Sequence, residues 1–164
     1  MGFAVSAIDL LYANRNALFD DFLGLNETNR LAKGLALISH FSPYFWAIVD
    51  GKTGETAGVV YLYDVVGTPK KPFSAYLSTC FRRKYWGSFV TRSTKKFMRY
   101  VFGKLRLHKL FAEIYADNLL GCRCVERSGF EVVARLPQQT IRGGMLTDTM
   151  LFVKFKSKRN LKVN

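Results

Sequence analysis

The sequence of 164 residues is long enough for one domain with a substantial core, and 49% of its residues are hydrophobic, which excludes an intrinsically disordered chain. It contains no run of about eighteen apolar residues, so we expect no membrane span. Lysine and arginine total 25 against 12 acidic residues, a net charge of +13. This charge favours a nucleic acid, an acidic partner or a phosphorylated cofactor, or it serves solubility together with a basic C-terminal tail at about 156–164.

The cysteines indicate a reducing compartment. Cys80, Cys122 and Cys124 are few and odd in number, and the N-terminal segment lacks the charged region that precedes the apolar part of a signal peptide. We therefore expect free thiols in a cytoplasmic protein. His40 and His108 are isolated in sequence, and no metal site is expected. Without linkers or repeats, residues 1–164 are expected to form one domain.

The first part of the chain predicts two helices and then a hairpin. Apolar residues recur at helical spacing over about 8–23, and Asn26 is placed to cap a second helix. Residues 45–49 and 56–63 have the composition of strands. Turn residues at 50–54 join them, so these two strands should pair as a hairpin.

The middle of the chain predicts a strand, a helix and a second strand. Residues 73–81 form the first strand, a helix begins at Ser88 or Thr91 and ends near Gly103, and residues 109–115 form the second strand. A strand, helix and strand in this order imply parallel pairing with a right-handed crossover.

The last part predicts one more helix and a closing hairpin. Asp117 and Asn118 are placed to cap a helix that runs through Arg127. Strands at 132–140 and 145–155 then pair around a glycine-containing turn. The whole pattern indicates a mixed α/β architecture.

A basic stretch, RRKYWGSFVTRSTKKFMRYVF, joins the strand at 73–81 to the following helix. The amides at a helix N-terminus bind anions, and Gly87 would let a ligand approach the backbone closely. Arg82, Arg83 and Lys84 add positive charge. The arrangement suits a diphosphate better than a base edge, although an ordinary solvated basic helix has the same composition.

The order of elements downstream resembles the GCN5-related N-acetyltransferase (GNAT) superfamily, most of all the group that acetylates ribosomal-protein N-termini. The resemblance rests on the loop KYWGSF at 84–89, on KLFAEIYADNLLGCRCVERSGFEV at 109–132, and on Gly144 and Asp148 in the closing hairpin. It implies a central, mixed, mostly antiparallel sheet of about six to seven strands with a splayed parallel pair, flanked by about four helices. It also implies acetyl-coenzyme A (acetyl-CoA) as cosubstrate.

The resemblance assigns residues to each part of that cosubstrate. Amides of the loop would hold the pyrophosphate, the main chain of Phe81 and the side chain of Asn118 would contact the pantetheine arm, and an arginine would reach the 3′-phosphate. The predicted cofactor-binding residues are Phe81, Arg82, Arg83, Lys84, Tyr85, Trp86, Gly87, Ser88, Phe89, Asn118 and Arg127.

The predicted catalytic residues are Glu113 and Tyr115, which lie on one face of the strand at 109–115. Glu113 matches a glutamate that serves as base in some N-terminal acetyltransferases. Alternatively, Glu113 pairs with a basic neighbour and Tyr115 is a half-buried strand aromatic. Cys80 has no histidine near it in sequence, so a buried thiol is expected there rather than a nucleophile.

Four positions depart from the family pattern. Lys84 replaces Gln or Arg, Phe89 replaces Gly or Ala, Gly121 replaces a serine, and Val125 replaces the tyrosine that protonates the departing thiolate. The first hypothesis is acetyl transfer to a primary amine of a protein, at its N-terminus or a lysine. The alternatives are acetylation of aminoacyl-tRNA, or a degenerate domain that binds an acidic partner or nucleic acid without catalysis.

Overall fold

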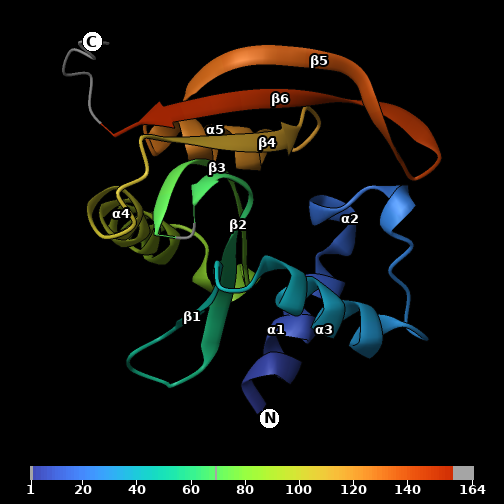
Figure 1. The fold of residues 1–164 in the computed structure, drawn as a ribbon. Coiled ribbons are helices and arrows are strands. Elements are labelled where there is room, and N and C mark those ends of the chain that lie inside the picture. Colours follow the sequence, from blue (N-terminus) through green and yellow to red (C-terminus); the bar gives the residue numbers. More distant parts are fainter. Residues whose placement is uncertain (1, 69, 157–164) are drawn as a thin grey trace.

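The computed structural model describes residues 2–68 and 70–156. These residues form one six-stranded sheet in the order β1-β2-β3-β4-β6-β5 (Figure 1). The strands are β1 (Phe45–Val49), β2 (Thr56–Thr68), β3 (Lys71–Phe81), β4 (Lys109–Tyr115), β5 (Glu131–Arg142) and β6 (Met145–Phe155). Among these described strands, only β3 and β4 pair in parallel, so the expected mixed, mostly antiparallel sheet is confirmed.

Helices cover both faces of this sheet. They are α1 (Gly2–Ala13), α2 (Arg15–Leu18), α3 (Arg30–Phe41), α4 (Ser88–Gly103) and α5 (Leu119–Arg127), with short 3-10 turns η1 (Asp21–Leu23) and η2 (Arg83–Tyr85). The helices α4 and α5 lie on one side, while α1 and α3 pack on the other (Figure 1). Among the described residues, no helix has the length and apolarity to cross a membrane. Nearly all of the expected basic tail lies outside the described residues.

Two buried clusters follow from the alternation of side chains along β2. Val60 and Leu62 face α4 and α5, where they pack with Phe152 of β6. Their neighbours Val59 and Tyr61 point the other way, toward α1. Because both faces of β2 are covered, its first half is a continuous apolar run, as expected for an internal strand.

Two N-terminal predictions are wrong, and both errors lie in capping chemistry. The helix expected over 8–23 is broken at Asn14 into α1 and α2, and it is broken again before η1, where Asp20 adopts an extended backbone and accepts a hydrogen bond from the amide of Phe22. Asn26 does not cap a helix. Instead, the side chains of Asn26 and Asn29 each accept from the other's amide, at 2.9 and 3.1 Å, and α3 begins at Arg30.

The later elements follow the sequence more closely. The strands at 45–49 and 109–115 and a helix beginning at Ser88 are confirmed. The strands predicted at 56–63 and 132–140 are longer, because each runs on through a β-bulge before its turn. In β5 the bulge holds Gln138 at a positive φ, and Asp148 of β6 accepts its amide at 2.9 Å.

Replacing Gly58 by alanine is expected to destabilise the protein. A Cβ there would lie 2.6 Å from the ring of Phe81 and 2.7 Å from the carbonyl oxygen of Cys80, so strand β3 or the ring must move. Overpacking of this kind costs about 1–3 kcal/mol. Thermal unfolding measures it, with Gly51→Ala as control, since nothing lies within 4 Å of that position. Equal melting temperatures for the two variants would contradict the close packing.

Candidate active site

The sheet opens between its two parallel strands. The pairing of β3 with β4 covers only residues 74–76 and 109–111. Beyond it β3 continues to Phe81 and β4 to Tyr115 without pairing to each other, while each stays bonded to its outer neighbour, β2 or β6. Buried backbone N–H and C=O groups require partners. Two strand edges therefore face each other across a gap that a ligand with its own amides can bridge.

The helix that follows β3 presents unpaired amides beside this gap. The amides of Tyr85 and Trp86 are used inside the η2 turn, whereas those of residues 88–90 donate to no described residue. Gly87 precedes them with φ 95° and ψ −126°, a conformation that favours glycine, and a Cβ there would meet nothing within 4 Å. The start of α4 is therefore an open, positively polarised site for an anion.

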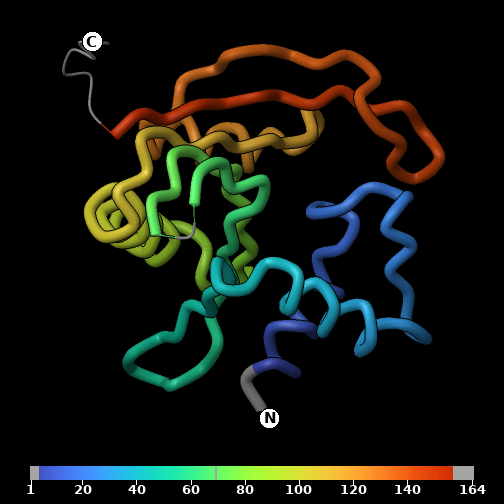
Figure 2. The backbone as a smooth tube through the Cα atoms, viewed as in Figure 1, coloured from blue at the N-terminus to red at the C-terminus, as the bar shows by residue number. Residues whose placement is uncertain are grey.

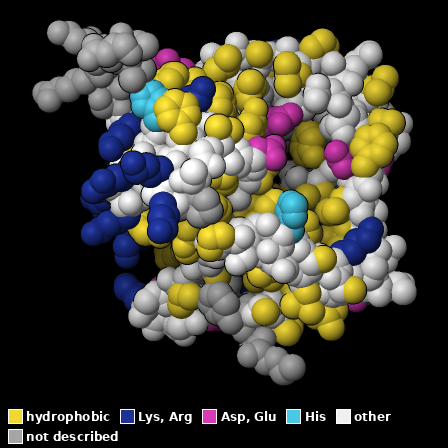
Figure 3. Space-filling view, viewed as in Figure 1, with side chains coloured by type: hydrophobic (Ala, Val, Ile, Leu, Met, Phe, Trp, Pro, Cys, Tyr) yellow, Lys and Arg dark blue, Asp and Glu magenta, His cyan; other side chains and the backbone are white. Residues whose placement is uncertain are grey.

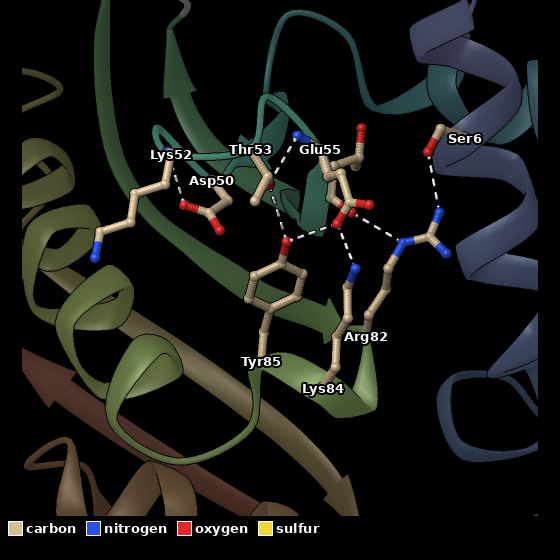
Figure 4. A network of polar contacts seen from close by, with 9 residues as sticks. Ser6, Asp50, Lys52, Thr53, Glu55, Arg82, Lys84 and Tyr85 are labelled. Atoms are coloured by element: carbon tan, nitrogen blue, oxygen red, sulfur yellow. Dashed lines mark hydrogen bonds and ion pairs between the residues drawn. The ribbon is translucent and has the colours of Figure 1, made fainter.

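The side chains of Arg82 and Lys84 are bonded to protein groups outside the loop (Figure 4). Lys84 forms an ion pair with Glu55, and the hydroxyl of Tyr85 donates to the same carboxylate at 3.0 Å. Hydrogen bonds from Lys84 and Tyr85 lower the pKa of Glu55. Arg82 donates through Nε to the carbonyl of Thr56 at 2.9 Å. These contacts fix the loop to the β1–β2 turn and the start of β2.

Glu113 lies half-buried on the other side of the gap, on the sheet face that α1 and α3 cover. Burial raises the pKa of its carboxyl, and the nearby charge of Asp64 adds to the effect. No described residue forms a hydrogen bond or ion pair with it. Acidic side chains sit among hydrophobic ones in the middle of this face (Figure 3). A carboxylate in this state is suited to accept a proton near neutral pH.

Tyrosines surround this carboxylate. Tyr63 and Tyr76 are cross-strand partners with ring centroids 5.3 Å apart, and both have raised pKa values because of burial and then the charge of Glu113. Burial likewise raises the pKa of Tyr115 to about 12. All three hydroxyls are therefore protonated at neutral pH. Faces of aromatic rings beside an acid attract an ammonium group.

The β5–β6 turn is fastened to the N-terminal segment beside Tyr115. The Arg142 guanidinium lies 4.0 Å from the Tyr115 ring centroid and forms an ion pair with Asp117 at 2.7 Å. The Asp21 carboxylate accepts from the amides of Gly143 and Gly144 at 3.0 and 2.9 Å. The tube in Figure 2 shows this turn next to the segment between α1 and α3.

A hollow of about 500 Å³ lies between that turn and the N-terminal segment. Three acids, Asp20, Asp21 and Asp117, and two bases, Arg15 and Arg142, line it. It is therefore a moderately acidic recess adjoining Tyr115, on an otherwise basic protein.

Comparison with known protein families identifies the family of this chain. A family model described as an acetyltransferase (GNAT) domain matches residues 19–131, which is more than half of the chain. The chain belongs to the GNAT acetyltransferase family. A comparison with curated proteins returned no match.

Solved structures share the GNAT fold over nearly the whole chain. The ribosomal-protein-S5-alanine acetyltransferase of Vibrio fischeri has a TM-score of 0.73 at 16% identity, covering 98% of this chain and 91% of that one. A variant of the spermidine N-acetyltransferase SpeG of Vibrio cholerae has a TM-score of 0.75 at 19% identity, covering 96% and 90%. Identities this low support the fold alone.

GNAT acetyltransferases take the acetyl group from acetyl-CoA, and the residues of the gap fit that donor. A pyrophosphate is an anion, which matches the unpaired amides of residues 88–90 at the start of α4. The pantetheine arm carries amides that suit the unpaired edge of β3. At the C-terminal end of β3, the carbonyl of Phe81 is already occupied, because Trp86 donates to it from Nε1 at 3.1 Å.

The predicted cofactor-binding residues fall into two sets: those at the open start of α4, and the charged residues of the preceding loop. Gly87, Ser88 and Phe89 lie at the open start of α4, with Phe89 packed on the buried ring of Tyr85 at 4.8 Å. Of the three loop charges, Arg82 and Lys84 are bonded to protein groups, and only Arg83 has no partner among the described residues. The larger aromatic at 89 is accommodated by turning inward rather than toward the helix start.

The departures in α5 have a structural reason. Asn118 is the N-cap of this helix, and its Oδ1 accepts from the Gly121 amide at 3.0 Å. A Cβ at Gly121 would lie 2.8 Å from Nδ2 of Asn118, so the glycine makes room for that amide. Val125 packs against the core cluster. The position of the family tyrosine is thus apolar here, and α5 supplies no hydroxyl in its place.

Reasoning from the sequence missed several residues of the site. Glu55, Tyr63 and Tyr76 all lie upstream of the loop, in or before strands that the pattern treated as core. The alternation of Tyr61 and Tyr63 along β2 places both on one face and is the signal that was available. No signal in the sequence pointed to Arg142, because only the folded hairpin brings its guanidinium over the ring of Tyr115.

Removing the carboxylate of Glu113 is expected to stabilise the fold at neutral pH. A pKa raised by folding favours the protonated form, so that stability is complete below the ordinary pKa of 4.5 and is lost as pH rises through the folded value. Glu113→Gln should therefore melt higher than wild type at pH 8 and equally at pH 4. The exposed Glu126→Gln is the control. A lower melting temperature for Glu113→Gln at pH 8 would contradict the desolvation.

Proposed function

We propose that the protein is an N-acetyltransferase that moves the acetyl group of acetyl-CoA onto a primary amine of a protein, at its N-terminus or at a lysine. The observation that carries this proposal is Glu113, a half-buried carboxylate of raised pKa that no cation among the described residues contacts, at the edge of the opened sheet. An approaching ammonium supplies the missing cation, so the site favours an amine acceptor.

Glu113 acts as the general base. An ammonium nitrogen has no lone pair for attack, so it must first release a proton, and the carboxylate takes it directly or through a water. The nitrogen then bonds to the acetyl carbon as the bond from that carbon to sulfur breaks. A base whose pKa lies above the ordinary value for glutamate is better matched to this transfer at neutral pH.

Tyr115 supplies the proton that the departing sulfur needs. It lies two residues beyond Glu113 on the same face of β4, and its pKa of about 12 keeps the hydroxyl protonated. The Arg142 guanidinium over its ring favours the phenolate that forms when the proton leaves. Tyr115 thereby protonates the departing sulfur, a role that the valine at position 125 cannot perform.

The recess beside Tyr115 supports a peptide acceptor. About 500 Å³ accommodates a peptide end rather than a lone ammonium, and its acids outnumber its bases. The spermidine and ribosomal-protein acetyltransferases of similar fold act on amines by their names. The residues that surround the recess come from the N-terminal segment and the β5–β6 turn.

Acetylation of aminoacyl-tRNA is the second candidate. The observation in its favour is the exposed basic side of α4, where Lys and Arg side chains gather on the left of Figure 3. Arg92 and Lys96 on this helix form no hydrogen bond or ion pair with a described residue. The remaining alternative is a binding protein without catalysis. Acetyl transfer in any of the assays below would exclude it.

A negative charge at the start of α4 should abolish binding of the donor. Both Gly87→Ala and Gly87→Glu strain the backbone at φ 95°, but only the second places a carboxylate in the open space before the amides. We expect Gly87→Glu to bind acetyl-CoA at least tenfold more weakly than Gly87→Ala, since repulsion by a fixed charge exceeds 1.4 kcal/mol at close range. Calorimetric titration measures both. Equal affinities would place the diphosphate elsewhere.

Glu113 and Tyr115 should control opposite limbs of the pH–rate profile. Glu113→Gln is expected to lower kcat by about 10²–10³-fold and to remove the rise of kcat with pH, while leaving acetyl-CoA affinity unchanged. Tyr115→Phe should remove the fall at high pH. The assay compares a peptide with a free N-terminus, an N-acetylated peptide containing lysine, and spermidine, with product mass as readout. A Glu113→Gln variant with a wild-type profile would exclude it as the base.

A further inference from the structure

The positive charge of the chain is concentrated in one segment. Residues 65–112 contain no aspartate or glutamate and hold twelve of the 25 lysines and arginines, whereas the rest of the chain has nearly equal numbers of the two signs. The twelve are Lys70, Lys71, Arg82, Arg83, Lys84, Arg92, Lys95, Lys96, Arg99, Lys104, Arg106 and Lys109. The net charge of +13 therefore belongs almost entirely to β3, α4 and the loops around them. A field of one sign attracts a polyanion.

The exposed side of α4 carries much of this charge (Figure 3). Arg92, Lys96, Tyr100 and Lys104 follow one another at intervals of four residues, with Lys104 at the C-cap, and all four are exposed. We call these four residues the α4 stripe. The side chains of its three cations form no hydrogen bond or ion pair with any described residue. Like charges four residues apart weaken a helix, and a bound polyanion relieves that repulsion.

The α4 stripe also contains a fixed aromatic ring. Tyr100 is 38% exposed, and its ring meets that of Trp46 edge to face, with 5.8 Å between the centroids. Trp46 belongs to β1, the outermost strand on that side of the sheet, and it also contacts Phe97 of α4 at 5.3 Å. These contacts hold the tyrosine ring in place while part of it stays open to solvent. A base can stack on such a ring while its phosphates pair with the cations one turn before and after it.

We propose that the α4 stripe is a binding surface for single-stranded RNA. An acidic protein segment would satisfy its cations but would bring no ring to stack on Tyr100. A duplex keeps the faces of its bases inside the stack, whereas loops and ends of RNA leave them free to stack on aromatic side chains. The combination of unpaired cations with a partly exposed ring therefore favours unpaired RNA over both.

The α4 stripe is separate from the acceptor side of the gap. The helix α4 packs on the sheet face opposite to α1 and α3, whereas Glu113 lies on the face that α1 and α3 cover (Figure 1). From Arg92 to Lys104 the stripe extends about 18 Å, at about 1.5 Å per residue, away from the amides at the start of α4. RNA bound there is thus a partner that positions the protein rather than the acceptor. The inference goes beyond the proposed acetyl transfer and does not depend on it.

Binding of a fluorescent, uridine-rich oligoribonucleotide of about twelve nucleotides, followed by anisotropy at several salt concentrations without acetyl-CoA, tests the charge of the α4 stripe. For single strands, each phosphate neutralised contributes about −0.7 to the slope of log affinity against log salt, so Arg92→Ala/Lys96→Ala should flatten the slope by about 1.4. Arg123→Ala/Arg127→Ala is the matched control, because it removes two cations at the same spacing from α5. It should keep the wild-type slope.

Variants of Tyr100 test the stacking. Tyr100→Leu should bind the oligomer about tenfold more weakly with an unchanged salt slope, since base–aromatic stacking is lost while the charge stays. Tyr100→Phe keeps the ring and should bind as wild type does. Thermal unfolding of both variants verifies that the packing against Trp46 survives.

Three results would overturn the proposal: no binding of the oligomer by wild type, the same flattening of the slope in both double variants, or equal affinities of Tyr100→Leu and Tyr100→Phe. Tighter binding of a polyglutamate peptide would assign the α4 stripe to an acidic protein instead, and tighter binding of DNA of the same sequence would reject RNA as its ligand. Arg92→Ala/Lys96→Ala should acetylate a peptide as wild type does, so the acetyl-transfer assays and the RNA titration can fail separately.

Discussion

The short parallel pairing of β3 with β4 is the constraint on which the rest of the site depends. The two strands are bonded over three residues each and then separate, yet each remains bonded along its outer side, to β2 or to β6. The gap is therefore held open by two rigid halves of the sheet. Both helices that follow these strands begin beside it, so the anion site of α4 and the capped start of α5 face the same opening.

The charged groups near the gap perform two separate tasks. Glu55 and Thr56 bind Lys84 and Arg82, so these two side chains are already engaged within the protein (Figure 4). Arg83, between them in sequence, has no partner among the described residues. A side chain already bonded to a carboxylate gains little from a second anion, whereas an unpaired one gains the full interaction. Proximity in sequence to the loop is thus a poor guide to ligand contact.

The acceptor side of the site is assembled from segments far apart in the chain. Glu113 and Tyr115 come from β4, Tyr63 and Tyr76 from β2 and β3, and the N-terminal segment meets the β5–β6 turn through Asp21 and Arg142. The half-buried carboxylate is a source of instability at neutral pH, because burial disfavours its charged form. Function at such a position and maximal stability make opposite demands on one residue.

The sequence by itself determined the mixed α/β class, the strand–helix–strand unit, most element bounds after residue 45, and the glycine at the start of α4. These depend on periodicity and on local capping, which are short-range properties. It misjudged the helix over 8–23 and the cap at Asn26, where neighbouring asparagine and aspartate side chains compete for the same amides. Only the tertiary structure decided which cations are already paired, which tyrosines surround Glu113, and that Arg142 covers Tyr115. Those facts depend on contacts between residues many positions apart, and no spacing along the chain encodes such distances.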